Sequence, residues 1–217
     1  MYRRLLAEFI GTAFLLTGVI GSGIMAERLT DDVGLQLLAN AAATVAVLYT
    51  IILMFGPVSG AHFNPAVTIS DASLGSRPWS DVGPYIVAQL AGGAIGVIAA
   101  NLMFELDAVN VSEKVRDGGG QYLGEIIATF GLVFLIFSLV RSGREQMAAA
   151  AVAAYIGGAY WFTSSTSFAN PAISVTRTLS NTFAGIDPGS APMFILMELI
   201  GAGLAVAAIR VLYPARS

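Results

Sequence analysis

The sequence predicts an all-α membrane protein with six transmembrane helices and two re-entrant half-helices arranged as an inverted repeat. Of its 217 residues, 56% are hydrophobic and 12% are charged, whereas soluble domains carry about 25% charged residues. At about 20 residues per transmembrane helix, this length allows six helices with short connections. The third observation is a triplet that occurs twice between apolar segments, at Asn64-Pro65-Ala66 and at Asn170-Pro171-Ala172.

The composition excludes several kinds of chemistry. The chain has no cysteine and one histidine, His62, so it has no disulfide, thiol nucleophile or cysteine metal site, and we expect no histidine metal cluster. We expect no metal, no cofactor and no nucleic-acid partner. The hydroxyl-rich run at residues 163–167 has no histidine or acid placed to activate a serine, so we do not expect an enzyme.

The six predicted transmembrane helices correspond to long apolar runs at residues 3–24, 35–56, 82–104, 121–140, 146–163 and 192–213. Within the first run, residues 5–24 follow Arg3 and Arg4, as the apolar part of a signal peptide follows its basic residues. Its apolar stretch is about 20 residues, longer than the roughly 7–15 residues of a signal sequence. We therefore interpret it as a helix, with cleavage near Ala26 as the alternative.

Two further stretches, residues 57–78 and 163–190, are too polar and too rich in small residues to span a bilayer. Asn is a favoured helix N-cap and Pro is a favoured first helical residue, so each triplet predicts the start of a helix. The helical residues after each triplet extend for about 10–12 positions, which crosses half a bilayer. We therefore predict two half-helices that re-enter the membrane and meet.

Basic residues predict the orientation, because they concentrate on the cytoplasmic side of membrane proteins. With six helices both termini share one side, which has seven of the eleven basic residues: Arg3, Arg4, Arg77, Arg141, Arg144, Arg210 and Arg216. We predict a multi-pass protein of the plasma (inner) membrane with both termini in the cytoplasm.

The two halves of the chain resemble each other. Glu8 in the first helix parallels Glu125 in the fourth, and Gln89 in the third parallels Glu198 in the sixth. Each half holds three helices, an odd number, so the second half starts from the opposite face. Inverted repeats with broken helices are typical of transport proteins. We predict a single channel domain over residues 1–217, with repeats at residues 1–105 and 121–217.

These features make the chain resemble the aquaporin and glycerol-channel family, the major intrinsic proteins. The resemblance covers essentially the whole chain and rests on Ser59-Gly60-Ala61-His62-Phe63-Asn64-Pro65-Ala66-Val67-Thr68, the second triplet, and the paired Glu8 and Glu125. It implies a homotetramer in the lipid bilayer with one pore per subunit. It also implies that Glu8 and Glu125 hold the backbone of the re-entrant loops. The alternative is that these acids lie solvated near the lipid headgroups.

The predicted helix starts explain how such a pore selects its solutes. Each helix N-terminus carries about half a positive charge, and Asn64 and Asn170 can each donate an amide N–H to a passing oxygen. The positive centre repels cations and hydronium, while a neutral hydroxyl-bearing solute exchanges its water contacts for these donors. We predict that His62 and Val67 line the cytoplasmic vestibule, and a pH gate at His62 is the alternative.

The predicted selectivity filter departs from what the family implies. Typical relatives have arginine directly after the second triplet, where this chain has Ile173. Counting back from the triplets without gaps puts Thr44 and Gly158 at the filter positions of the second and fifth helices. Ser167 falls on the remaining loop position. These small, uncharged side chains predict a constriction wider than a water-only filter.

One arginine complicates this prediction. Arg177 lies four residues past Ile173 and therefore shares its helix face. Because side chains on a helix lean toward its N-terminus, Arg177 either reaches back over Ile173 or points to water and to acids such as Asp187.

We predict a passive channel for water and small uncharged solutes, with glycerol-sized polyols or neutral metalloid hydroxides such as arsenous acid favoured. A bacterial subgroup that lacks the filter arginine resembles this chain and is associated with arsenic handling. The alternatives are a water-selective channel, a coupled secondary transporter, and a scaffold protein with a closed pore. A coupled transporter needs a titratable group near the midplane, where the sequence places only asparagines.

Overall fold

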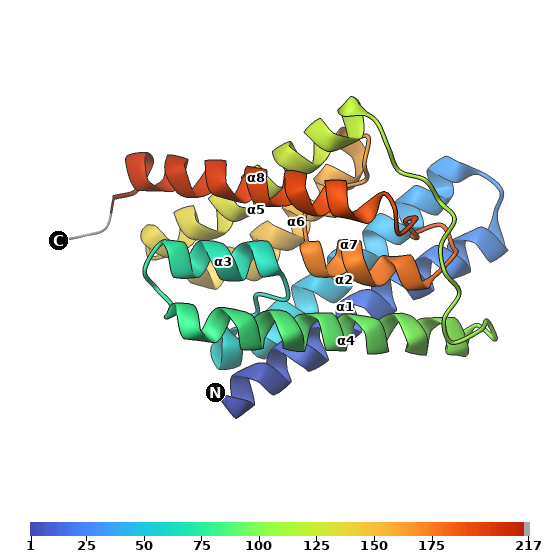
Figure 1. Ribbon diagram of the computed structural model, residues 1–217, viewed down its shortest axis with the longest axis horizontal. Helices are drawn as coiled ribbons and strands as arrows, with labels where there is room; N and C mark the ends of the chain where they lie inside the picture. The colour runs from blue at the N-terminus through green and yellow to red at the C-terminus, as the bar shows by residue number, and fades with distance from the viewer. Residues whose placement is uncertain (215–217) are drawn as a thin grey trace.

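The computed structural model describes residues 1–214, and this range contains eight α-helices (Figure 1). Six of them form the wall: α1 (Tyr2–Leu29), α2 (Val33–Ser59), α4 (Val82–Met103), α5 (Gly119–Arg141), α6 (Ala148–Phe162) and α8 (Ala191–Leu212). The inner helices and single 3-10 turns are α3 (Pro65–Ser73), α7 (Pro171–Thr176), η1 (Trp79–Asp81), η2 (Glu145–Met147) and η3 (Arg177–Leu179). The predicted fold class is confirmed. Arg216, which contributed to the predicted orientation, lies outside the described residues.

The molecule has two ends, which differ in the chain segments that lie there. We call the end with the start of α1 and the end of α8 the terminal face, and the end with the connection 104–118 the loop face (Figure 1). Between α4 and α8, α3 extends toward the terminal face and α7 toward the loop face (Figure 1). The two short helices therefore together occupy the depth that one wall helix spans alone.

Five wall helices in the described range are long and apolar enough to cross a membrane: α1, α2, α5, α8, and α4 together with η1. Helix α6 has 15 residues, which is roughly 22 Å at the usual rise per residue and shorter than the predicted run 146–163. The residues after it, 163–169, are irregular and mostly buried. The turn η2 runs directly into α6, so helical backbone covers residues 145–162. Irregular backbone is tolerated at membrane depth when protein surrounds it, and residues 163–169 lead from the end of α6 to Asn170 at the centre.

Each half-helix begins at its triplet, as predicted. The Asn64 side chain accepts a hydrogen bond from the backbone N–H of Ala66 (2.8 Å), and Pro65 is the first helical residue. The Asn170 side chain accepts from the N–H groups of Ala172 (3.0 Å) and Ile173 (3.4 Å). Helix α3 has nine residues, and α7 has six before the chain continues into η3.

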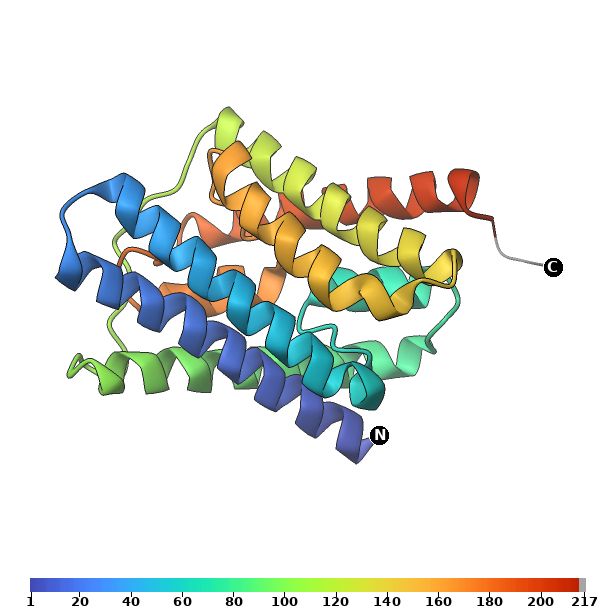
Figure 2. The same cartoon turned by 180° about the vertical axis from the view of Figure 1, so that it is seen from behind.

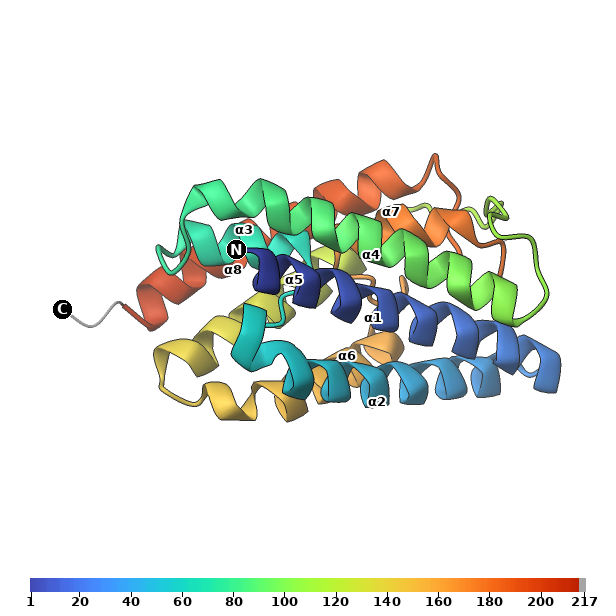
Figure 3. The ribbon, with the colours of Figure 1, turned by 90° about the horizontal axis from the view of Figure 1, so that it is seen from below.

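Helix packing follows the two halves, because α1 lies along α4 and α5 lies along α8. A Cβ added to Gly92 would lie 2.1 Å from the backbone oxygen of Phe9, and one added to Gly201 would lie 2.5 Å from that of Ile126. Glycine therefore lets the backbones touch at both crossings. Helices α2 and α6 lie side by side and close the wall (Figures 2 and 3).

Candidate functional site

The two triplets meet at the centre of the protein. Asn64 Nδ2 donates a hydrogen bond to the backbone oxygen of Ala169 (2.7 Å), and Asn170 Nδ2 donates to that of Phe63 (2.8 Å). Each asparagine thus binds the opposite loop with one amide hydrogen and retains a second for a solute. Both asparagines line one continuous cavity.

The loops before the triplets have an unusual backbone. Positive φ angles occur at Ala61 (50°), Phe63 (50°), Ser167 (53°) and Ala169 (49°), a conformation that non-glycine residues rarely adopt. Phe63 and Ala169 are the residues whose carbonyl groups accept from the opposite asparagine. The strained backbone therefore aims these carbonyl groups at the pore centre, and the buried hydrogen bonds hold it there.

The cavity has a volume of about 750 Å³ and passes both asparagines. Toward the terminal face it is lined by Asp71 and Arg77, and toward the loop face by Tyr160 and Arg177. Apolar side chains form much of the wall between: Leu15, Val19, Leu48, Leu132, Val152 and Ile156. The cavity therefore extends to both sides of the triplets, as a conducting path requires.

On the loop side, Thr44 lines the cavity and Gly158 does not. Thr44 Oγ1 lies 3.1 Å from the hydroxyl oxygen of Tyr160, which is the α6 residue at this level. Gly158 is exposed on the outer surface of α6, so its predicted place in the filter is wrong. Counting without gaps missed the length of the irregular loop, and a two-residue error turns a helix position by about 200°, to the opposite face.

Ser167, Ile173 and Arg177 also line the loop-side end of the cavity. Arg177 is only 2% exposed, and its Nε donates to the backbone oxygen of Ala184. Its guanidinium carbon lies 3.5 Å from the ring centroid of Phe168. Arg177 therefore turns inward, toward the cavity, so the alternative that it points to water is wrong.

A second buried arginine also contacts Phe168. Arg116, in the connection 104–118, has its guanidinium carbon 4.9 Å from the ring centroid. Its side chain donates to the backbone oxygens of Gly185 (2.9 Å), Ser165 (3.3 Å) and Phe183 (3.4 Å). Burial lowers the pKa of Arg116 to about 10, so this guanidinium stays charged at neutral pH. Arg116 therefore joins the connection 104–118 to the loops that contain Ser165 and Gly185. Arg177, in contrast, reaches the cavity.

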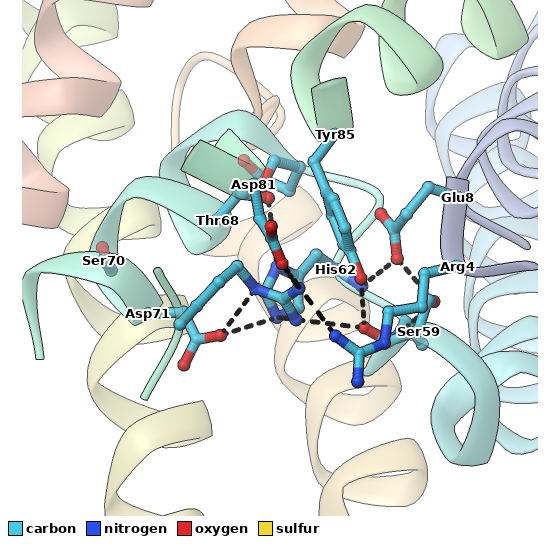
Figure 4. A network of polar contacts seen from close by, with 12 residues as sticks. Arg4, Glu8, Ser59, His62, Thr68, Ser70, Asp71, Asp81 and Tyr85 are labelled. Atoms are coloured by element: carbon cyan, nitrogen blue, oxygen red, sulfur yellow. Dashed lines mark hydrogen bonds and ion pairs between the residues drawn. The ribbon is translucent and has the colours of Figure 1, made fainter. Parts of the chain in front are cut away.

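On the terminal side, His62 lies in a network of polar side chains (Figure 4). With Val67, it lines the cavity. His62 Nδ1 lies 3.0 Å from Thr68 Oγ1, and Nε2 lies 3.4 Å from Asp71 Oδ2. Arg77 Nε binds the same Asp71 oxygen at 3.0 Å. Because both ring nitrogens have partners, His62 is a packed, hydrogen-bonded residue at the mouth of the cavity.

Arg77 connects this network to the surrounding wall. Its guanidinium carbon lies 4.1 Å from the ring centroid of Tyr85, and it donates to the backbone oxygen of Ser59 at 3.2 Å. It also pairs with Asp81 at 3.7 Å, and Arg4 approaches the same carboxylate at 3.9 Å (Figure 4). A network of charged side chains therefore reaches the terminal mouth of the cavity, where Asp71 and Arg77 line it.

Glu8 and Glu125 are both fully buried, so the alternative that places them solvated near the headgroups is wrong. Their backbone and hydroxyl donors are Ser59 Oγ (2.6 Å), His62 N (3.0 Å) and Phe63 N (2.7 Å) for Glu8, and Phe168 N (3.0 Å) and Ala169 N (2.7 Å) for Glu125. Each carboxylate binds two successive N–H groups in the loop before its triplet. This is the contact that the resemblance implies for both glutamates.

Sequence reasoning did not assign Tyr160, Arg77 or Asp71 to the pore. One signal was available, because Asp71 precedes Arg177 by 106 residues, the spacing that also separates Asn64 from Asn170. The two charged residues occupy equivalent places after the two triplets, and both line the cavity. Tyr160 gave no comparable signal, since its place depends on where α6 ends.

Comparison with known proteins finds a family, and relatives within it, that this chain resembles. Residues 1–166 match the family described as major intrinsic protein. The chain is 48% identical over 215 residues to the aquaglyceroporin AqpS of Rhizobium meliloti (strain 1021), which covers 99% of this chain and 92% of that protein. It is 32% identical over 157 residues to the glycerol uptake facilitator protein of Streptococcus pneumoniae (strain ATCC BAA-255 / R6), which covers 64% of this chain and 65% of that protein.

A solved structure has the same fold. The X-ray structure of the aquaglyceroporin from Plasmodium falciparum matches with a TM-score of 0.74 over 97% of this chain and 96% of that chain. The sequence identity of this pair is 18%, so the match concerns the fold alone.

Proposed function

Because the chain belongs to the major intrinsic protein family and is a membrane channel for water and small solutes such as glycerol, we propose that its filter admits glycerol-sized polyols and neutral metalloid hydroxides such as arsenous acid. The observation that carries this proposal is Ile173, an uncharged residue that lines the cavity directly after the second triplet. The name of the 48% identical relative, an aquaglyceroporin, supports a solute of this size.

The proposed filter combines Thr44, Tyr160, Ser167, Ile173 and Arg177. Ile173 and the ring of Tyr160 present apolar surface to the carbon chain of a polyol. The hydroxyl groups of Thr44 and Tyr160 and the guanidinium of Arg177 offer hydrogen bonds to its oxygens. A path with one apolar and one polar edge suits a small molecule that carries hydroxyl groups on one side.

We propose that the centre of the pore excludes ions and protons. The half-helices α3 and α7 begin at Asn64 and Asn170, so their positive N-terminal ends both face the solute path. Each asparagine offers one amide hydrogen, and a water molecule bound to both cannot keep the orientation that proton hopping needs. The positive charge of Arg177 adds a barrier to cations nearer the loop face.

We also propose the topology and assembly. The terminal face is placed in the cytoplasm and the protein in the plasma (inner) membrane, on the count of basic residues. Residues 1–105 and 121–217 are assigned as the two repeats of one channel domain. A homotetramer is proposed from the resemblance to the family. The wall helices carry large exposed apolar side chains that lipid or a second subunit must cover, such as Phe14, Leu53 and Trp161.

Placing arginine at position 173 tests the wide filter. Ile173→Arg is expected to lower glycerol and arsenous acid flux at least about tenfold, which corresponds to a barrier higher by ~1.4 kcal/mol, and to lower water flux less. Stopped-flow light scattering on proteoliposomes measures water and glycerol, and arsenic uptake measures arsenous acid. Ile173→Val is the matched control and should conduct as the parent does. A parent that passes water but neither glycerol nor arsenous acid would show a water-selective channel instead.

Removing the inward-facing arginine tests its place in the filter. Arg177→Ala is expected to raise glycerol flux about threefold to tenfold, because a barrier lower by ~0.7–1.4 kcal/mol has that effect, and to weaken the exclusion of cations. The same proteoliposomes, with an added sodium-flux assay, provide the measurement. Arg177→Lys keeps the charge and should retain cation exclusion. Unchanged permeability to every solute in Arg177→Ala would remove Arg177 from the filter.

A further inference from the structure

The two repeats hold their triplets with different chemistry. In the first repeat, Gln89 on α4 donates a hydrogen bond through Nε2 to Glu8 Oε2 (2.8 Å). In the second repeat, Glu198 on α8 takes the equivalent place. Glu198 Oε1 accepts from the backbone N–H of Asn170 (3.1 Å) and from Ser174 Oγ (2.7 Å). An acid thus binds the second triplet directly, whereas Gln89 contacts Glu8 and Thr68 and its Oε1 has no partner among the described residues.

Glu198 and Glu125 form a buried pair of carboxyl groups, which we call the acid pair. Both side chains are fully buried, and they bind successive backbone N–H groups, Glu125 that of Ala169 and Glu198 that of Asn170. Glu198 Oε2 has no hydrogen-bond partner among the described residues. Two buried carboxylates on adjacent amides cannot both be ionised without a large electrostatic cost, so we expect the acid pair to hold a proton.

The hydrogen-bond geometry assigns this proton to one oxygen. Glu125 accepts two backbone N–H groups, and Glu198 Oε1 accepts two donors of its own. The remaining oxygen, Glu198 Oε2, can then donate to Glu125, just as Gln89 Nε2 donates to Glu8. A protonated Glu198 and Gln89 therefore share the donor that faces the loop-holding glutamate, and Glu198 adds an acceptor that binds Asn170 and Ser174.

The charges around the acid pair fit a single negative charge. The guanidinium groups of Arg177 and Arg116 both pack on the ring of Phe168, whose backbone N–H binds Glu125. Helix α7 itself has no titratable side chain. The other ionisable groups on packed elements have partners of their own. Asp71 of α3 binds Arg77, and Tyr122 of α5 donates to Asp117. Arg141 of α5 and Arg210 of α8 donate to backbone oxygens of Leu74 and Ser73, Tyr155 of α6 donates to those of Ile127 and Ala128, and the hydroxyl of Tyr160 lies 3.1 Å from Thr44 Oγ1.

We propose that Glu198 is a positioning residue that carries the shared proton of the acid pair, and that this neutral acid holds Asn170 and Ser174 in the conducting arrangement. With the proton present, α8 is joined to the second triplet through two accepted hydrogen bonds and to Glu125 through one donated bond. Loss of the proton sets two negative charges side by side and weakens the contact of Glu198 with Asn170, the residue that faces the solute.

Infrared spectroscopy tests the proton directly. The purified parent at neutral pH is expected to show the C=O stretching band of a protonated carboxylic acid, and Glu198→Gln is expected to lack it. The reciprocal variant, Gln89→Glu, places an acid beside Glu8 and should add a second such band. A parent without this band, or a band that persists in Glu198→Gln, overturns the proposal. If Glu198→Gln fails to fold, Gln89→Glu still tests the proposal. A Gln89→Glu protein whose infrared spectrum equals that of the parent also contradicts the proposal.

Flux measurements test the positioning. Glu198→Gln preserves both the acceptor and the donor, so its glycerol flux at neutral pH should stay within about twofold of the parent, whereas Glu198→Leu should lose about tenfold or more. As pH rises into the alkaline range, parent flux should fall while Glu198→Gln flux stays level. Identical pH profiles for the two proteins contradict the proposal. The flux result depends on the proposed solutes and the infrared band does not, so failure of the two ideas can be distinguished.

Discussion

Replacing Glu8 by leucine is expected to abolish the folded channel. The two carboxylate oxygens of Glu8 accept four hydrogen bonds, from Ser59, His62, Phe63 and Gln89. Leucine leaves these donors without an acceptor in the protein interior, at about 1–3 kcal/mol for each. Their sum is comparable to the whole stability of a typical domain, about 5–15 kcal/mol. The loop before the first triplet then loses the acceptor of its two N–H groups at His62 and Phe63, and its strained backbone keeps only the bond from Asn170 to the Phe63 carbonyl.

The measurement is thermal unfolding in detergent together with glycerol flux in proteoliposomes. Glu8→Leu should show no cooperative unfolding transition, and its glycerol flux should equal that of liposomes without protein. Glu113→Leu is the matched control, because Glu113 is an exposed acid in the connection 104–118, and it should behave as the parent does. A Glu8→Leu protein that unfolds and conducts normally would refute a supporting role for Glu8.

Substituting alanine for Gly92 is expected to separate α1 from α4. The added Cβ would lie 2.1 Å from the backbone oxygen of Phe9 and 2.9 Å from its carbonyl carbon. These are backbone atoms, so no side-chain rotation relieves the clash, and overpacking of this kind costs about 1–3 kcal/mol or more. Phe9 directly follows Glu8, so the shift of α1 also displaces the acid that supports the first triplet.

Gly203→Ala provides the control for this substitution. Gly203 also lies within a wall helix, but nothing lies within 4 Å of a Cβ placed there, and alanine favours a helix by about 1 kcal/mol over glycine. Gly92→Ala should therefore unfold at a lower temperature than the parent and conduct less, while Gly203→Ala should match or exceed the parent. Equal unfolding temperatures for the two variants would contradict the proposed backbone contact.

The fold and the place of the triplets could be predicted from local sequence, for a physical reason. Lipid provides no hydrogen bonds, so long apolar runs have few alternatives to the helix. The sequence Asn-Pro starts a helix wherever it occurs in a permissive context, because the cap and the first turn are local features. Glu8 and Glu125 could be assigned through the resemblance, since an acid in an apolar helix needs partners.

The filter and the acid pair required the three-dimensional arrangement. Tyr160 faces the cavity because of where α6 ends, and irregular backbone such as residues 163–169 has no fixed rise from which that end could be counted. Arg177 turns inward because the Phe168 ring and the Ala184 carbonyl lie where only the folded loops bring them. Side-chain direction at such places depends on long-range contacts, and these contacts have no signature in neighbouring residues. The sequence alone therefore determined the helices, the two triplets and their meeting, while packing between distant segments determined which side chains a solute encounters.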